Sequence, residues 1–224
     1  MEDALCKRKD VSMVYIDNCK AYDSVPHQWT LDVLKAYKVS LVVIRFLAAA
    51  MKMWKTDLFL YHENGCVVVE GVQFRRGIYQ GDSLSPLLFI ISVNPISLLL
   101  NRKCRGYKLE GMNLTHVLYM DDLKGFCDSP KSLQVMCEII EEFTCDIGME
   151  LGLSKCGVIH IQKGKYASLG SITLKSGGVI LELKAKEFYK YLGIEELVGI
   201  DHKKVKERVW KKAKTKLRKY WNQN

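Results

Sequence analysis

Two adjacent carboxylates stand between two short apolar runs. Asp121 and Asp122 separate residues 116–120 from residues 124–127, and a third acid, Asp17, ends a β-branched and aromatic run upstream. Such runs are typical of strands, so the acid pair is expected at a hairpin tip. Close carboxylates repel one another and favour a cation. Mg²⁺ binds a few carboxylate oxygens and keeps its other positions for water and phosphate. Two such ions roughly 3.5–4 Å apart can activate a hydroxyl and steady a leaving pyrophosphate. The acids therefore suggest nucleotidyl transfer, and a solvated Asp-Asp turn is the alternative.

The elements that must position these acids mix helix and strand patterns without regular alternation. Apolar residues at three- and four-residue spacing indicate helices, and short β-branched runs indicate strands. The predicted order is a strand at 11–17, helices at 29–37 and 44–54, a hairpin turning at Asn64-Gly65, one helix at 86–101, the acidic hairpin, a helix at 130–148, and short strands around 157–162, 172–182 and 188–192. This order favours an α+β fold with an antiparallel sheet packed on helices.

Composition excludes several classes of protein. The chain has 224 residues, 48% of them hydrophobic, enough for one domain or one domain and part of another. Its longest apolar run, Ser85–Leu100, is interrupted by polar residues and Pro95 and is shorter than the roughly 20 residues of a membrane span. The first ten residues lack the apolar core of a signal peptide, so we expect an intracellular protein, with nucleus and cytoplasm both open.

Eight cysteines are present, but no two of them form a C-x-x-C pair. Zinc sites usually show such spacing, so zinc binding is disfavoured. Reduced thiols that mostly pack as small apolar groups are the expected use of these residues.

Positive charge is concentrated at the end of the chain. Residues 201–224 hold ten Lys and Arg against two acids and so carry +8 of the net +9. Asp201 is expected to cap a helix in which apolar residues recur every four positions, from Val205 through Val209 to Leu217. Such a helix can pack one face on a globular body and follow a nucleic-acid backbone with the other. Calmodulin-type or membrane-surface binding is the alternative.

Five motifs in one order resemble the reverse transcriptase family. They span about 180 residues, and the strings around Tyr22 and Ser85 look most like non-LTR retrotransposons, ahead of group II intron maturases and telomerase-like proteins. The motifs are IDNCKAYDSVPH at 16–27, RRGIYQGDSLSPLLF at 75–89, LYMDDL at 118–123, LSKC at 153–156 and YKYLGI at 189–194. The resemblance implies a right-hand polymerase palm that synthesises DNA on an RNA template.

The resemblance also implies roles for individual residues. Asp17, Asp121 and Asp122 would be the catalytic carboxylates that hold two Mg²⁺ ions, with Mn²⁺ as a substitute. Lys155 matches a lysine that protonates the leaving pyrophosphate, although a plain surface lysine fits the same position. Tyr22 matches the bulky side chain that lies beneath the incoming sugar and excludes a ribose 2′-OH, and a core aromatic is the alternative.

Other matched positions concern nucleotide and primer. Gln80 and Gly81 match a loop that touches the incoming nucleotide, where glycine permits close backbone approach. Arg76 could meet template or triphosphate, or belong to a solvated face. The residues matched to primer and template are Tyr119, Met120, Tyr191, Leu192 and Gly193; Tyr191 and Leu192 could equally be ordinary core.

We therefore expect a palm at residues 1–195 and the start of a helical thumb at 196–224. Only 16 residues precede Asp17, so the fingers are expected to be largely absent. The expected partners are an RNA template, a DNA primer and dNTPs, with fingers and thumb segments of a larger polyprotein and no membrane. The alternatives are a catalytically incompetent nucleic-acid-binding remnant and a relic without function.

Overall fold

The computed structural model describes most of the chain, namely residues 1–63, 65–185, 187–197, 199–200, 206–207, 209–211 and 213–215. The predicted turn residue Asn64 and the predicted cap Asp201 lie outside the described residues. Within 206–215 the described residues are helical. Of the residues that their spacing placed on a packed face, Val209 is 58% exposed and Ala213 is partly buried, and packing of the whole face stays a prediction.

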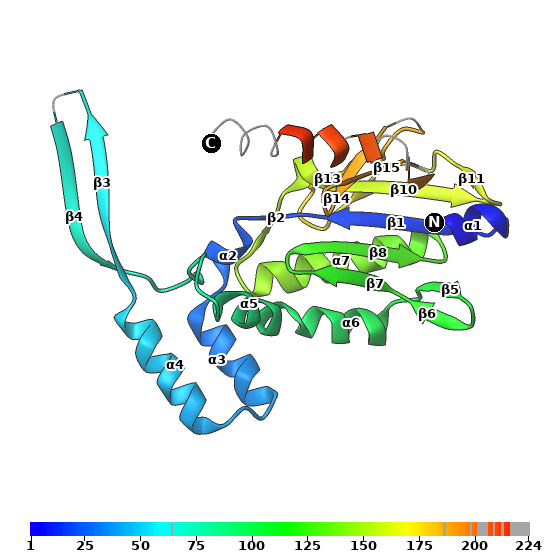
Figure 1. Ribbon diagram of the computed structural model, residues 1–224. Coiled ribbons are helices and arrows are strands. Elements are labelled where there is room, and N and C mark those ends of the chain that lie inside the picture. The colour runs from blue at the N-terminus through cyan, green and yellow to red at the C-terminus, as the bar shows by residue number, and fades with distance from the viewer. Residues whose placement is uncertain are drawn as a thin grey trace.

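A five-stranded antiparallel sheet forms the centre of the molecule (Figure 1). All six residues of its middle strand are buried, as expected for a strand covered on both faces. In spatial order the strands are β11 (Lys165–Tyr166), β10 (Gly157–Gln162), β1 (Val11–Ile16), β8 (Asp122–Cys127) and β7 (His116–Tyr119). The predicted strands around the acids are confirmed, with Asp122 itself the first residue of β8.

The two faces of β1 enter two separate hydrophobic clusters. Val14 and Ile16 pack with the helices, whereas Met13 and Tyr15 pack on the opposite face with residues of β10 and with Tyr191. This division follows from the two-residue period of a strand. The face that carries Tyr15 is the one covered by a small three-stranded sheet of β14 (Tyr189–Tyr191), β15 (Ile194–Leu197) and β16 (Gly199–Ile200).

Three helices cover the other face of the sheet (Figure 1). They are α5 (Ser85–Val93), α6 (Pro95–Lys103) and α7 (Pro130–Asp146). The Ser129 side chain caps α7 as predicted, because its hydroxyl accepts a hydrogen bond from the Ser132 amide at 3.2 Å. The single helix predicted for 86–101 is wrong: two helices meet at Asn94 because Pro95 lacks an amide donor and begins a new helix.

The stretch Ser85–Lys103 is also, by length and hydropathy alone, the one described segment that could cross a membrane. Its hydropathy comes partly from residues that pack in the helix-side core, including Leu88, Phe89 and Leu100. Core helices commonly combine these properties.

A two-stranded arm extends away from the rest of the molecule (Figure 1). It consists of β3 (Lys55–His62) and β4 (Gly65–Gln73), which confirms the predicted hairpin. The two predicted helices α3 (His27–Ala36) and α4 (Leu41–Met53) precede the arm in the chain. The short helix α1 (Glu2–Cys6) comes before β1, and the short helix α2 (Ala21–Ser24) comes after it.

The remaining described elements are short. They are β2 (Asn18–Cys19) paired with β9 (Glu150–Leu151), β5 (Tyr107–Leu109) with β6 (Met112–Leu114), β12 (Ile172–Thr173) with β13 (Val179–Ile180), and the 3₁₀ turn η1 (Leu153–Lys155). All eight cysteines are free, but only four are buried, so packing as apolar groups accounts for half of them.

Candidate active site

The strand register brings the three predicted carboxylates to one end of the sheet. Ile16 of β1 lies opposite Leu123 of β8, and both are buried on the helix side. The next position along each strand is therefore Asp17 on one and Asp122 on the other, facing the opposite side. Asp121 precedes Asp122 in the two-residue loop between β7 and β8.

The loop between β7 and β8 has a strained residue. Tyr119 pairs with Asp122, which leaves Met120 and Asp121 as the loop, and Met120 adopts a φ of 55°. A residue with a Cβ rarely adopts this conformation, and the cost is of order 1–3 kcal/mol. The Met120 sulfur accepts a hydrogen bond from the Tyr22 hydroxyl at 3.8 Å, which helps to hold the turn.

The acids influence one another electrostatically. Burial raises the pKa of Asp122, and the negative charges of Asp121 and Asp17 raise it further, while Lys155 opposes them. Close like charges favour the neutral form of a carboxyl group, so this pKa shift is the signature of a cluster that a cation would stabilise.

Lys155 supplies a cation that pairs with Asp17. Its Nζ lies 3.2 Å from Asp17 Oδ2, and this hydrogen bond raises the pKa of the lysine. Lys155 ends η1, which is held beside Asp17 because the Gly152 amide donates to the Asp17 carbonyl at 2.8 Å. A side chain at Gly152 would displace the Asp17 carboxylate, since an added Cβ would lie 2.9 Å from Asp17 Oδ2.

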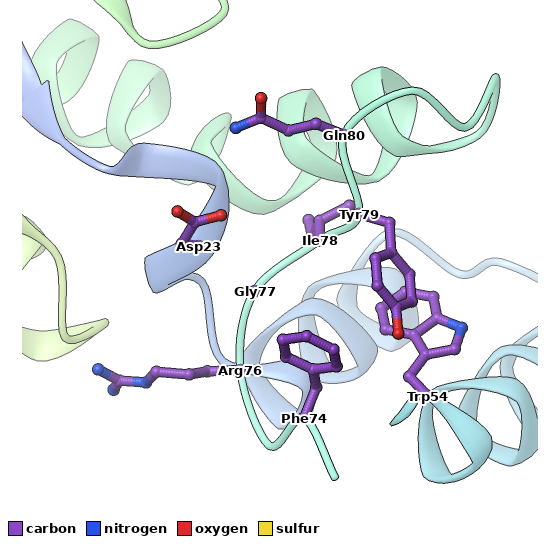
Figure 2. A pocket seen from close by; sticks show the side chains of 8 residues that line it. All are labelled: Asp23, Trp54, Phe74, Arg76, Gly77, Ile78, Tyr79 and Gln80. Atoms are coloured by element: carbon purple, nitrogen blue, oxygen red, sulfur yellow. The ribbon is translucent and has the colours of Figure 1, made fainter. Parts of the chain in front are cut away.

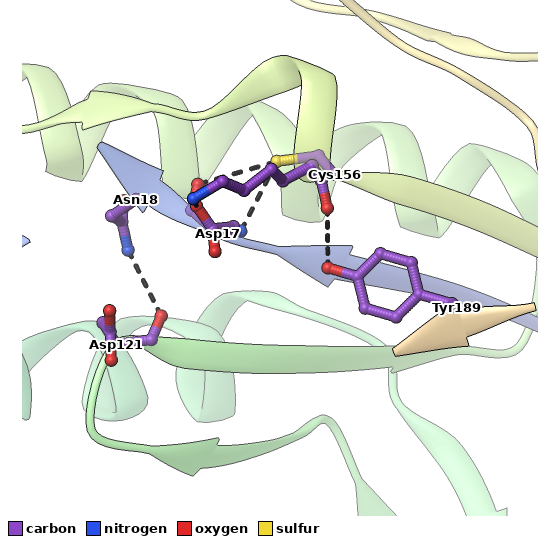
Figure 3. A network of polar contacts seen from close by, with 6 residues as sticks. Asp17, Asn18, Asp121, Cys156 and Tyr189 are labelled. Atoms are coloured by element: carbon purple, nitrogen blue, oxygen red, sulfur yellow. Dashed lines mark hydrogen bonds and ion pairs between the residues drawn. The ribbon is translucent and has the colours of Figure 1, made fainter. Parts of the chain in front are cut away.

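Two further side chains join the strand ends (Figure 3). Asn18 Nδ2 donates to the Asp121 carbonyl at 3.4 Å, and its Oδ1 is buried without a partner among the described residues. The Asp17 amide donates to Cys156 Sγ at 3.5 Å. Neither Asn18 nor Cys156 was predicted as a site residue, although each adjoins a residue that was.

Carboxylate oxygens are the donors that Mg²⁺ prefers, so Asp17, Asp121 and Asp122 fit such an ion by chemistry and by their place at one end of the sheet. In the described part of the chain, however, no group of three or more His, Cys, Asp or Glu side chains is close enough to hold a metal ion as it stands. Lys155 occupies one Asp17 oxygen instead.

The predicted nucleotide residues lie on a loop attached to α2. The Ile78 amide donates to the Tyr22 carbonyl at 2.8 Å, which ties the loop of Gln80 and Gly81 to the turn after Asp17. Gly81 has a φ of 100°, a conformation that favours glycine. Tyr22 stacks on Phe89 with ring centroids 4.3 Å apart, so it has core contacts as well as its place beside Met120.

A cavity of about 480 Å³ opens beside this loop (Figure 2). Asp23 and Gln80 lie at one end, and the aromatic rings of Trp54, Phe74 and Tyr79 lie at the other. The aromatic walls were not predicted as site residues. Trp54 follows α4, whereas Phe74 and Tyr79 lie in the loop after β4, so no short spacing in the sequence connects all three.

Arg76 points away from Trp54 and Tyr79 (Figure 2). Its guanidinium lies against Gly148, where an added Cβ would be 2.6 Å from Nη2. This position is at the C-terminal end of α7, whose exposed carbonyls favour a cation. The structure thus gives Arg76 a contact within the fold, and contact with template or triphosphate stays a prediction.

The predicted primer-support residues form a hairpin turn. Tyr191 pairs with Ile194, and the two loop residues Leu192 and Gly193 have φ values of 48° and 77°. Positive φ at both loop positions is the requirement of a tight type I′ hairpin. Tyr191 is buried, whereas Leu192 and Tyr119 are exposed.

Comparison with known proteins identifies relatives of this chain. A family model described as reverse transcriptase (RNA-dependent DNA polymerase) matches residues 2–195. The chain is 27% identical over 199 residues to the Retrovirus-related Pol polyprotein from type-1 retrotransposable element R2 of Nasonia vitripennis, covering 87% of this chain and 19% of that protein. It is 29% identical over 183 residues to the corresponding polyprotein from type-2 element R2DM of Drosophila melanogaster, covering 80% of this chain and 17% of that protein. The chain thus spans less than a fifth of either relative.

Solved structures of similar fold include two of telomerase from Candida Tropicalis. The apo enzyme truncated from its C-terminal domain aligns with a TM-score of 0.52 and 16% identity, covering 80% of this chain and 37% of that one. Another apo structure aligns with a TM-score of 0.51 and 13% identity, covering 76% and 32%. These likenesses show the polymerase palm fold. With the family match over 2–195 and the R2 relatives, they establish that the chain belongs to the reverse transcriptase (RNA-dependent DNA polymerase) family, as a domain of the non-LTR retrotransposon type.

Proposed function

We propose that this chain is the catalytic palm of an RNA-directed DNA polymerase, part of a retrotransposon polyprotein. It would join a dNTP to a primer 3′-OH on an RNA template. The observation that carries the proposal is the convergence of Asp17, Asp121 and Asp122 at one sheet end, where burial and then the charges of Asp121 and Asp17 raise the pKa of Asp122. Such a cluster destabilises a fold unless a cation neutralises it, so it is more readily explained by catalysis than by structure.

Asp17, Asp121 and Asp122 are proposed to hold two Mg²⁺ ions, or Mn²⁺. When bound, such ions would supply activation of the primer hydroxyl and stabilisation of the pyrophosphate charge. Lys155 would have to leave the Asp17 oxygen that it now contacts, which would free its ammonium to give a proton to the leaving group. Its 70% exposed side chain has room for that movement.

The nucleotide is proposed to lie between Tyr22 and the loop of Gln80 and Gly81. The aromatic cavity beside Gln80 suits a nucleobase, because base stacking on aromatic rings is worth about 1–3 kcal/mol. The division into a palm at 1–195 and a thumb start at 196–224, and the intracellular location, stay predictions.

Extension of a labelled DNA primer on an RNA template with dNTPs and Mg²⁺ tests the proposal. The chain should extend the primer, and Asp121→Asn/Asp122→Asn should abolish extension. Asp32→Asn, which alters an exposed carboxylate of α3, is the matched control and should retain full activity. Extension by the double variant at the wild-type rate would refute the metal-binding role of these acids.

A catalytically incompetent nucleic-acid-binding domain is the second candidate. It is favoured by the Lys155–Asp17 ion pair, which engages one of the three carboxylates. In that case the chain would bind primer–template without extending it. Asp121→Asn/Asp122→Asn would then leave the affinity unchanged or raise it in the presence of Mg²⁺.

A further inference from the structure

A buried lysine lies on the sheet face that carries the acids. Lys124 of β8 is 8% exposed and forms an ion pair with Glu196 of β15. Lysine is almost never buried to this degree unless it is paired. The pair joins the central sheet to the small sheet that covers it, and nothing in the proposed chemistry uses it.

Tyrosines surround the pair and belong to both sheets. Lys124 Nζ lies 4.8 Å from the ring centroid of Tyr15 and 5.3 Å from that of Tyr191. The Tyr15 hydroxyl donates to Glu196 Oε2 at 2.6 Å, and the Tyr15 ring stacks on Tyr189 with centroids 4.0 Å apart. These contacts dock the β14–β15 hairpin on β1 and β8.

These residues form a docking cluster on the same face of the sheet as the acids. Its members are Tyr15, Lys124, Tyr189, Tyr191 and Glu196. Tyr15 and Lys124 are a cross-strand pair, and Asp17 and Asp122 follow two positions along on the same face. The hairpin also contacts the segment beside Asp17, because the Tyr189 hydroxyl donates to the Lys155 carbonyl at 2.6 Å (Figure 3).

The end of the hairpin lies beside Lys124, two positions from Asp122 on the same face of β8. Tyr191 adjoins the turn of Leu192 and Gly193, and its pKa is raised to about 12, first by burial and then by the charge of Asp122. Its hydroxyl is buried without a partner among the described residues. A buried donor that lacks a partner is uncommon in a folded protein and suggests a group supplied by a ligand.

We propose that the Lys124–Glu196 ion pair is a positioning device that sets the Leu192-Gly193 turn against the acids, so that a primer 3′ end placed by the turn meets Asp122. An ion pair suits this task because neither buried charge tolerates the loss of its partner. A movement of the hairpin that separated Glu196 from Lys124 would leave both charges buried and unpaired. The inference rests on the proposed polymerase function.

Direct primer binding tests this inference without requiring catalysis. Anisotropy would compare a 3′-recessed DNA primer on an RNA template with the RNA template alone, for wild type, Lys124→Met, Glu196→Gln and the double variant. Lys124→Arg is the conservative variant. Lys35→Met removes an exposed ion pair with Asp32, 2.9 Å long on α3, and is the matched control.

Wild type should prefer the recessed primer, and each single variant should lose about tenfold in that preference, since small misplacements near reacting groups are costly. Lys124→Arg should restore most of it, and Lys35→Met should bind as wild type. Where extension is measurable, KM for primer should rise while KM for dNTP stays within about twofold.

Hydrogen exchange across 189–196 separates positioning from general stability. Faster exchange there, with the lost primer preference, supports the inference. Unchanged primer preference in both single variants overturns it, even if exchange accelerates, and so does a wild type that shows no preference for the recessed primer. Failure of wild type to extend a primer that it binds with this preference would overturn the proposed polymerase function alone.

Discussion

Replacing Asp122 by asparagine is expected to stabilise the protein when no divalent metal is present. The burial of Asp122 and the charges of Asp121 and Asp17 disfavour its ionised form, and asparagine has nearly the same shape without the charge. Sites arranged for chemistry often contain residues that lower the stability of the fold.

The magnitude follows from the neighbours of Asp122. Burial disfavours its charge first; of the charged neighbours, two acids repel it and one cation, Lys155, attracts it, which leaves about one unfavourable pair. Two unit charges about 4 Å apart interact by about 1 kcal/mol in water and about 4 kcal/mol at an effective dielectric constant near 20. Asp122 is only half-buried, so the lower figure applies. Asp122→Asn should therefore raise Tm by about 2–4 °C for a chain of this length.

The effect should depend on pH in a defined sense. The pKa of Asp122 is higher in the folded protein than the roughly 3.9 of an unfolded chain. Its contribution to stability is therefore fully present below about pH 4 and is lost as pH rises through the folded-state pKa. The Tm difference between variant and wild type should vanish below about pH 4 and be largest near pH 7.

Thermal unfolding in EDTA and then in excess Mg²⁺ measures both parts of this prediction. A ligand present at 100 times its Kd stabilises by about 2.7 kcal/mol, so Mg²⁺ should raise the Tm of wild type well above that of Asp122→Asn. Asp32→Asn is the control. Lys35 lowers the pKa of Asp32, so removing the Asp32 charge should not stabilise the protein. A lower Tm for Asp122→Asn in EDTA, or equal Mg²⁺ stabilisation of both proteins, would refute the reasoning.

Three further substitutions have definite expected outcomes. Gly152→Ala should displace the Asp17 carboxylate and reduce primer extension by roughly tenfold or more without loss of the folded circular dichroism spectrum; an unchanged rate would contradict the close contact. Ser129→Ala should lower the free energy of unfolding by about 1 kcal/mol in urea titrations, because α7 loses its N-terminal cap. Tyr22→Ala should raise ribonucleotide incorporation relative to deoxyribonucleotide by about tenfold, whereas Tyr22→Phe should not, and equal selectivity in single-nucleotide extension would disprove the steric role.

Local patterns predicted the elements next to the acids correctly. The run before Asp17 and the two runs around Asp121 are strands, of which β1 and β8 are buried, and their pairing alone places Asp17 beside Asp122. The helix cap at Ser129 was predictable because its signal is confined to a few adjacent residues. The break at Pro95 was missed because the apolar spacing continues across it on both sides.

Contacts between distant segments were beyond prediction from spacing. The aromatic cavity joins Trp54, Phe74 and Tyr79 through loop geometry that no short pattern encodes. The contact of Arg76 with Gly148 depends on how α7 ends against the loop, so neither of the predicted roles for Arg76 anticipated it. Glu196 gave no signal because it resembles any acid on a surface strand.

Lys124 did carry a signal, and its meaning lies in strand periodicity. A charged residue within the otherwise buried strand β8 requires a partner, and the two-residue period places it on the face of Asp122. The same period places Tyr15 on the face of Asp17. Tyr15 and Lys124 therefore stay on the face of the acids as long as the register of the sheet is kept. A substitution of Lys124 alone should therefore disturb the hairpin as well as the strand. The disturbance should be smaller when Glu196 is neutralised with it, because no buried charge is then left without a partner.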